Sequence, residues 1–457
     1  MLPAFILFLC FLFIGWLIYR DSLVRKLPSN ALWIPAIFLA IASSRQVSFW
    51  LAQIGITAGN TSNNPEGYSN LEGSPINAVF VGGLIVITLI VLYRRGFSWS
   101  NFASSNKAIL AIYAFFLLSS FWSPFPVPTV KRVIQDFVCL LTGLVLLSQE
   151  KPAFAIRIVY ARVSYILFPL SVIFIRYFPE IGRVYSGVSG AQMLSGVAGH
   201  KNLLGQVAMV FCLILVWDLF EMRKRAKSMG QPPNWHWPNL ISLCIGLYLL
   251  NISRSATALV CFLLGLTLLF YCKKLAKMKN PRMVFAAGLL FLMTTLALEQ
   301  TFGIKGRISE AFGRGSGMSG RDLIWNKALE KAPNQILGSG FRGFWETDAG
   351  ISVSEELFMN RLLTAHNGYI EVYLHGGITA LLLLSVWILS SIFKATNGLE
   401  NRNSISKLAI VFWPIFLLYN MSESTMFQTG ALWCTILIVT AQTPQILQSQ
   451  KESSRTI

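Results

Sequence analysis

Few side chains in this largely apolar sequence could do chemistry, and His366 is the first of them. It directly precedes Asn367, a good N-cap residue for the apolar helix expected at 367–393. The positive end of a helix dipole disfavours an imidazolium, so we expect His366 to be neutral at about pH 7. A neutral imidazole there could accept a proton from a hydroxyl group as a general base, and the alternative is a polar cap without chemistry.

Arginine and lysine side chains form the second group, and Arg254 is the most informative of them. It lies between Ser253 and Ser255 in a minimal turn that joins two apolar stretches. Charges at a membrane are costly unless they are paired or used, and guanidinium groups bind phosphate oxygens in bidentate fashion. The cations expected near the same membrane face are Arg45, Lys131, Arg132, Arg176, Arg183, Lys201, Arg254, Arg321, Arg342 and Arg361. This set predicts an anionic ligand.

These cations have alternative roles that involve no ligand. Each could pair with a carboxylate such as Asp136, Glu299 or Glu423. Arg254 could also cap the last carbonyl groups of the helix before it. In either case the charge would stabilise the fold and bind nothing.

The remaining histidines support weaker hypotheses. His200 stands at the head of an apolar span, followed by Lys201 and Asn202, and could bind a ligand or cap the helix. His375 lies within a span, where a packed and hydrogen-bonded role fits best, and His236 falls in an inner loop with no assigned role.

No metal site and no cofactor are predicted. A metal held by His200 and His366 is an alternative without support from ligand spacing. The seven cysteines lie in apolar stretches without a pairing pattern, and we interpret them as small core hydrophobes.

The composition defines the elements that must position these residues. Of 457 residues, 54% are hydrophobic and 13% are charged, and the mean hydropathy is +0.57. A soluble chain carries roughly 25% charged residues, so the sequence predicts an all-α polytopic membrane protein. Apolar stretches of membrane-spanning length occur about thirteen times. They are 2–19, 31–52, 76–93, 107–122, 130–148, 158–176, 201–220, 237–252, 255–272, 282–299, 367–393, 406–421 and 424–442. The first is interpreted as a retained span and not a signal peptide.

Charge in the connecting loops predicts the topology. Six basic loops fall on one side of the membrane, which the positive-inside rule identifies as the cytoplasm. The N-terminus is then outside and the C-terminal tail inside. The sequence divides into N-terminal helices over 1–299, a large outer loop over 300–366 and C-terminal helices with a tail over 367–457. In a bacterium the loop would face the periplasm from the inner membrane.

The outer loop is long enough to be functional. Apolar residues at helical spacing predict a short helix over 321–329 that ends before Pro333. Residues 338–343 fit the pattern GxGxxG, but no strand–helix unit surrounds them, so tight turns explain the glycines better than a dinucleotide site.

Several motifs together resemble the O-antigen ligase and O-antigen polymerase superfamily of bacterial envelope glycosyltransferases. They occur in order at 199–205, 253–255, 320–325, 338–341 and 366–369. Residues 42–51 and 121–124 resemble the exopolysaccharide-polymerase branch more than the lipopolysaccharide ligases. The resemblance covers most of the chain.

The resemblance implies a substrate and a mechanism. The donor would be a glycan on a polyprenyl pyrophosphate, and the acceptor a glycan or a lipid-linked glycan. Arg254 and Arg321 would hold the leaving pyrophosphate, and His366 would activate the acceptor hydroxyl for an inverting, metal-independent transfer. Further substrate-binding candidates are His200, Lys201, Asn202, Arg45, Asn367 and Arg342. Glu423 is given no chemistry.

Partners and alternatives complete the hypothesis. Membrane lipids, a chain-length regulator and export proteins are candidate partners, and no nucleic acid is expected. The alternatives are a flippase or transporter of lipid-linked sugars and a non-catalytic factor for polysaccharide assembly. Transporters tend to show repeated halves and charged or broken helices near the bilayer midplane, whereas the polar residues here concentrate at the outer rim.

Overall fold

The computed structural model describes residues 2–56, 74–185, 190–230, 232, 235–275, 321–357, 362–400 and 403–443. The span predicted at 282–299, the first part of the outer loop, Glu299 and Arg361 lie outside these ranges.

The chain is mostly helical, as predicted. Its α-helices are α1 (Leu2–Val24), α2 (Trp33–Ala42), α3 (Val47–Gln53), α4 (Pro75–Arg94), α5 (Trp99–Ser105), α6 (Lys107–Leu118), α7 (Pro126–Leu147), α8 (Pro152–Tyr177), α9 (Pro179–Gly182), α10 (Lys201–Ser228), α11 (Trp237–Ile252), α12 (Ala256–Leu275), α15 (Arg321–Glu330), α16 (Asp348–Glu356), α17 (Gly368–Glu400), α18 (Ser404–Tyr419) and α19 (Ala431–Thr440). Short 3-10 turns are η1 (Asn30–Leu32), η2 (Ser119–Phe121) and η3 (Phe344–Glu346). Strands β1 (Arg183–Tyr185) and β2 (Gln192–Leu194) pair antiparallel, with Val184 opposite Met193, and are an addition to the all-α prediction.

Candidate membrane-spanning helices occur in the described ranges. Five are long and apolar enough to cross a bilayer by length and composition, and up to seven if each bent helix pair is one span. The predicted span 31–52 is such a pair, because α2 and α3 meet at 77°. The predicted span 237–252 coincides with α11. The predicted span 424–442, however, is helical only from Ala431 to Thr440.

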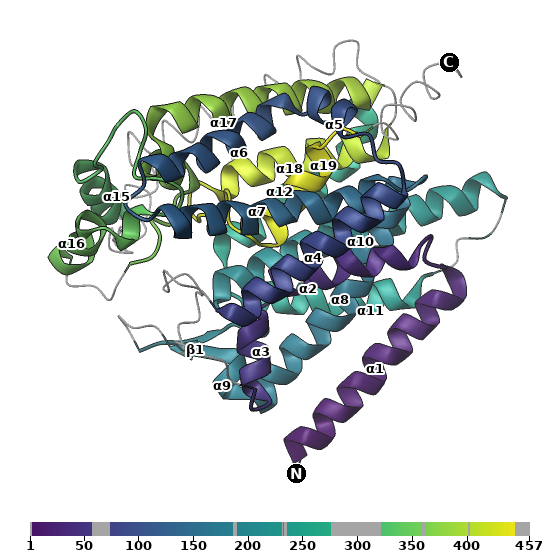
Figure 1. Ribbon diagram of the computed structural model, residues 1–457. Coiled ribbons are helices and arrows are strands. Elements are labelled where there is room, and N and C mark those ends of the chain that lie inside the picture. The colour runs from purple at the N-terminus through teal and green to yellow at the C-terminus, as the bar shows by residue number, and fades with distance from the viewer. Residues whose placement is uncertain are drawn as a thin grey trace, which may run out of the picture. The chain divides into compact units, whose positions relative to one another are not determined.

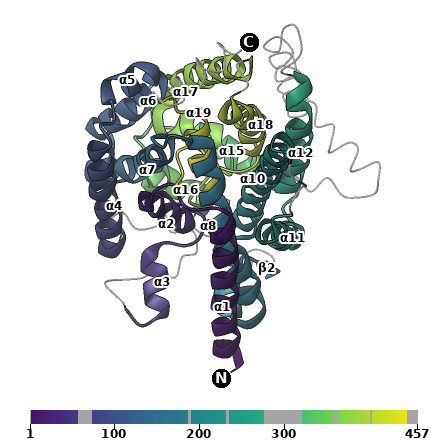
Figure 2. The ribbon, with the colours of Figure 1, turned by 90° about the vertical axis from the view of Figure 1, so that its right-hand side faces the viewer.

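Two compact units make up the chain. The first comprises Met1–Asn106, Ile134–Leu269 and Phe427–Ser449, and the second comprises Lys107–Val133, Phe270–Met426 and Gln450–Ile457. In the first unit, α8 packs against α1, α2, α9, α10 and α11, and α10 also packs against α11 and α19 (Figure 1). Figure 2 shows α1 and α8 of this unit from a second direction. Helix α8 is buried along most of its length, so it forms the centre of this unit.

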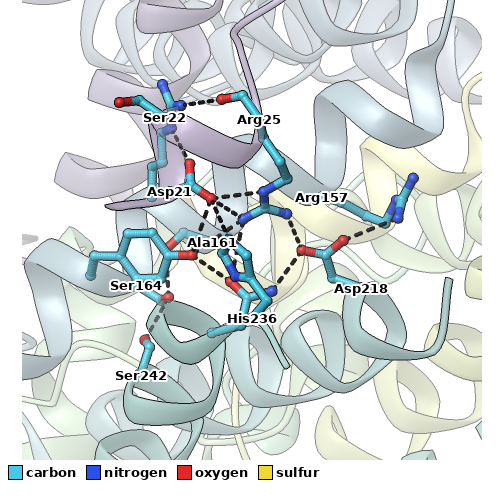
Figure 3. A network of polar contacts seen from close by, with 12 residues as sticks. Asp21, Ser22, Arg25, Arg157, Ala161, Ser164, Asp218, His236 and Ser242 are labelled. Atoms are coloured by element: carbon cyan, nitrogen blue, oxygen red, sulfur yellow. Dashed lines mark hydrogen bonds and ion pairs between the residues drawn. The ribbon is translucent and has the colours of Figure 1, made fainter. Parts of the chain in front are cut away.

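A buried ionic network joins the helices of the first unit (Figure 3). Asp21 of α1 accepts hydrogen bonds from the Nε atoms of Arg25 and Arg162, each at 2.7 Å. Asp218 of α10 pairs with Arg25 and also with Arg157 of α8 at 3.0 Å. Buried charges are tolerated only when they are paired and hydrogen-bonded, and these contacts pair both carboxylates.

His236 belongs to this network, so the prediction that it has no role is wrong. Its side chain is 2% exposed, and its Nε2 lies 3.4 Å from the Asp21 carboxylate. Burial and the charge of Arg25 lower the pKa of His236 to about 4, against the opposing pull of Asp21 and Asp218. The sequence did not indicate this role of His236, because all the charged partners of His236 come from other elements.

In the second unit, α17 packs against α6 and α18 (Figure 1). Helix α17 is interrupted at Gly376 and Gly377, whose backbone is not helical. The interruption leaves room for residues 334–341. Ile378 N–H donates to the Gln335 carbonyl at 2.8 Å, and Ser339 N–H donates to the Leu374 carbonyl at 2.9 Å. This explains the glycines of the GxGxxG pattern as turn residues, as the sequence indicated.

The described part of the predicted outer loop forms a small helical layer on the start of α17. Ile324 and Ala328 of α15, Phe344 and Trp345 of η3 and Val353 of α16 bury their side chains together with Ala365 and Leu374. The predicted helix 321–329 is thus confirmed as α15, with its apolar face in this core. The layer fixes the position of the chain immediately before His366.

Candidate active site

His366 lies in a strained turn at the start of α17. Its φ angle is 52°, a conformation that L-residues rarely adopt. The Asn367 side chain accepts hydrogen bonds from the Tyr369 and Ile370 amides at 3.0 and 3.3 Å, which confirms the predicted N-cap. The Thr364 hydroxyl accepts the His366 N–H at 3.2 Å, and Gly368 N–H donates to the Asn420 carbonyl at 2.8 Å. The turn is therefore held on both sides of the histidine.

Glu423 links His366 to Arg321. Its Oε2 lies 3.3 Å from His366 Nδ1, and its Oε1 lies 2.9 Å from Arg321 Nη2. Arg321 Nη1 also donates to the Ser422 carbonyl. For Arg321, pairing with a carboxylate is therefore the arrangement found. Burial acts to raise the pKa of Glu423, but the hydrogen bond with His366 and the charge of Arg321 lower it below its usual value, so the carboxylate stays ionised.

This geometry assigns different roles to the two ring nitrogens of His366. A carboxylate next to Nδ1 favours the tautomer that carries its proton there, which leaves the Nε2 lone pair to accept a proton. The His366 side chain is 29% exposed, so it can be reached from outside.

The motifs at 199–205 and 253–255 meet in the first unit. His200 caps α10, because its Nδ1 accepts the Asn202 N–H at 3.3 Å. One turn further along, a Cβ atom on Gly205 would lie only 2.8 Å from the Ser255 Cβ and 2.9 Å from the Ser253 Oγ. Only a glycine allows the turn to pack this closely. It follows that the turn lies against the first turns of α10.

Arg254 is the central residue of that turn. Its φ angle is 50°, and its N–H donates to the Asn251 carbonyl at 3.2 Å. Its side chain is exposed, and within the described ranges its guanidinium group has no hydrogen-bond or ion-pair partner. The alternative in which this side chain caps helix carbonyls is thus not found there. Lys201, on the same end of α10, is half-buried, and the helix N-terminus adds a partial positive charge.

The two remaining arginine candidates make contacts within the protein. Arg45 is 9% exposed, donates to the Ile181 carbonyl at 2.7 Å, and lies 4.2 Å above the Phe49 ring. Arg342 has a φ angle of 52°, and its carbonyl accepts a hydrogen bond from Arg132. These contacts give Arg45 a structural role at the end of α2.

Sequence reasoning named Glu423 only as a possible partner of a cation and gave it no chemistry, and it missed Glu371. Glu371 is 2% exposed and accepts hydrogen bonds from the Ala365 amide and from Trp345 Nε1. Its position in the first turn of a predicted helix, just after His366, was the available signal. His375 is buried 3.2 Å from Glu371, which confirms its predicted packed role. Among the residues described here, no group of three or more histidine, cysteine or acidic side chains could hold a metal.

Comparisons with known proteins agree with the motifs. Residues 240–385, which include the Arg254 turn, α15 and His366, match the family model described as O-antigen ligase. This match supports the resemblance to the O-antigen ligase and polymerase-like family. It is similar to exopolysaccharide production protein ExoQ of Rhizobium meliloti (strain 1021), with 23% identity over 347 residues that cover 74% of this chain and 75% of the relative. The family and the apolar helices indicate a multi-pass membrane protein with a role in polysaccharide biosynthesis.

Proposed function

We propose that this protein is a glycosyltransferase of the bacterial inner membrane that polymerises or ligates polyprenyl-pyrophosphate-linked glycans at the periplasmic face. The observation that carries the proposal is the His366–Glu423 pair, an accessible imidazole whose Nδ1 is occupied by a carboxylate. Such an arrangement suits a general base that acts through Nε2. The loop charges, which predict that residues 300–366 lie outside, support the periplasmic location.

In the proposed reaction, His366 Nε2 takes the proton of the acceptor hydroxyl. The acceptor oxygen forms a bond to the anomeric carbon of the donor, and the bond from that carbon to the phosphate oxygen breaks on the opposite face, which inverts the configuration. The pyrophosphate leaves with the bonding electron pair. No metal takes part in this proposal, so cations must stabilise the leaving group, which is usually the largest catalytic contribution.

The exposed Arg254 is the proposed pyrophosphate ligand of the first unit, because its guanidinium has all its donors available among the described residues. Lys201 and Asn202, beside the same turn, would assist it. In the second unit Arg321 uses one N–H of each Nη for Ser422 and Glu423. A guanidinium has five N–H donors, so Arg321 retains others for a phosphate oxygen.

The test is product formation from purified lipid-linked oligosaccharide in proteoliposomes. His366→Ala and Arg254→Ala should each reduce transfer at least 100-fold, the order of a lost general base or oxyanion ligand. Arg225→Ala, an exposed arginine at the far end of α10, is the matched control and should retain activity. Full activity in both test variants, with normal insertion and folding, would refute the proposal.

Polymerisation and ligation predict different intermediates in a strain that lacks this protein. Accumulated single repeats with loss of long polymer would identify a polymerase. Full-length polymer left on the polyprenyl carrier would identify a ligase. An unchanged profile would contradict both and favour the assembly-factor alternative, and transport of labelled lipid-linked sugar without covalent change would favour a flippase.

A further inference from the structure

The backbone immediately before His366 is held by side chains of two other elements. Ala365 is fully buried, and both of its backbone polar groups are occupied. Its N–H donates to Glu371 Oε1, and its carbonyl accepts the Trp325 Nε1 hydrogen at 2.7 Å. Trp325 belongs to α15 and Glu371 to α17. The peptide groups on either side of Ala365 are therefore fixed by contacts that ordinary loop packing does not supply.

Glu371 is a buried carboxylate, and its burial is energetically unfavourable unless its oxygens are hydrogen-bonded. It is 2% exposed, and burying a carboxylate costs several kcal/mol unless its oxygens are bonded. Here Oε1 also accepts the Trp345 Nε1 hydrogen at 3.0 Å, and Oε2 lies 3.2 Å from His375 Nε2. A neutral amide acceptor could satisfy the Ala365 N–H alone. The carboxylate brings three elements together at one point: the turn before His366, η3 and the second turn of α17.

The strained conformation of His366 needs such support. An L-residue in the left-handed region is disfavoured by roughly 1–2 kcal/mol, so a free turn would relax to another conformation. Relaxation would rotate the imidazole away from Glu423. The φ angle of His366 describes rotation about the bond that follows the Ala365–His366 peptide, and Trp325 binds the carbonyl of that peptide. Glu371 binds the N–H of the preceding Thr364–Ala365 peptide, so the two contacts together limit the relaxation.

We propose that Glu371 is a positioning residue, which holds the left-handed turn at His366 and thereby keeps the imidazole against Glu423. The proposal rests on the proposed function of His366 as the base. Glu371 touches neither substrate nor the reacting proton, and acts on His366 through the Ala365 N–H. Trp325 is its counterpart on the carbonyl side.

The test compares variants that remove or keep the acceptor oxygen. Glu371→Leu should lower kcat about 10- to 100-fold, the order expected for a misplaced catalytic group, with the KM for the donor within about twofold. Hydrogen exchange of the peptide covering 362–368 should become faster. Glu371→Gln keeps an oxygen that can accept from Ala365 and should recover most of kcat. Glu330→Gln, an exposed glutamate of α15, should leave both readouts unchanged.

Trp325→Phe provides a second route if Glu371→Leu does not fold. It keeps the ring in the core but removes the donor to the Ala365 carbonyl, and it should lower kcat with little change in KM. Unchanged kcat in either folded variant, or an equal fall in Glu371→Gln and Glu371→Leu, would overturn the proposal. If His366→Ala is fully active, the base assignment fails instead, and hydrogen exchange still reports whether Glu371 holds the turn.

Discussion

Lowering the pH from about 7.5 to 5 should destabilise the first unit through His236. The pKa of the buried imidazole is about 4, whereas its ordinary value is 6.5. As the pH falls through 6.5, the unfolded chain takes up a proton that the folded protein does not, so folding stability decreases until about pH 4. Each pKa unit corresponds to about 1.4 kcal/mol, so the difference between the two pKa values corresponds to about 3 kcal/mol of folding stability. About 2 kcal/mol of this is lost by pH 5.

The assay is denaturant unfolding in detergent micelles at both pH values, for the natural protein and for His236→Gln. The charged groups around the ring are Asp21 and Arg25 of the α1 end and Asp218 of α10. They remain in the variant, so the difference between the two proteins isolates the histidine. The variant should lose about 2 kcal/mol less between the two pH values. Equal pH dependence in both proteins would show that His236 is not buried as a neutral group.

Three further changes test the sites and the fold. Glu423→Gln should lower kcat about 10- to 100-fold, because a hydrogen bond to a charged group contributes about 1.5–3 kcal/mol; an unchanged kcat would show that the carboxylate does not orient the ring. Gly338→Ala should destabilise the protein by about 3 kcal/mol more than Gly96→Ala. The φ angles of Gly338 and Gly96 are 66° and 62°, so the backbone strain of an alanine would be similar at both. Of the two, only Gly338 has backbone in the way, because a Cβ there would lie 2.5 Å from the His375 carbonyl carbon. Equal losses of thermal stability would therefore contradict the close packing of Gly338 against α17. Gly205→Ala should raise the KM for the donor severalfold by displacing the Arg254 turn, whereas Gly82→Ala, where a Cβ meets nothing within 4 Å, should not; equal KM values would refute this.

Local features were predictable from the sequence because neighbouring residues determine them. The span 237–252 coincides with α11, since its apolar run is bounded by Pro238 in the first turn and the serine turn at its end. Asn367 caps α17 as expected, because an N-cap needs only the amides two and three residues ahead. The prediction of a helix at 321–329 was confirmed because the helical spacing of its apolar residues is also a local feature.

Long-range features could not be predicted in this way. Glu423 is 57 residues from His366, and only the folded chain brings it to Nδ1. In the sequence, the region around Gly376 and Gly377 looks like part of an ordinary apolar span. The break in α17 is explained only by the hydrogen bonds that it makes with residues 334–341. The last predicted span failed because the Asn420 side chain binds the Thr425 and Met426 amides, which organises a loop before α19.

Backbone strain gives independent support to the choice of site residues. In the described part of the chain, the non-glycine residues with positive φ are Arg254, Arg342, His366 and Phe427. Three of these four were singled out from the sequence for their chemistry, without any knowledge of their conformation. Such conformations cost roughly 1–3 kcal/mol each and persist only where surrounding contacts impose them. Phe427 has its own explanation, because it is fully buried with its ring 4.6 Å from that of Trp433, and aromatic packing can hold it. Arg254 has an exposed side chain and His366 a partly exposed one, so packing of their own side chains in a core does not account for their strain, whereas a need to aim a cation and a base at a ligand would.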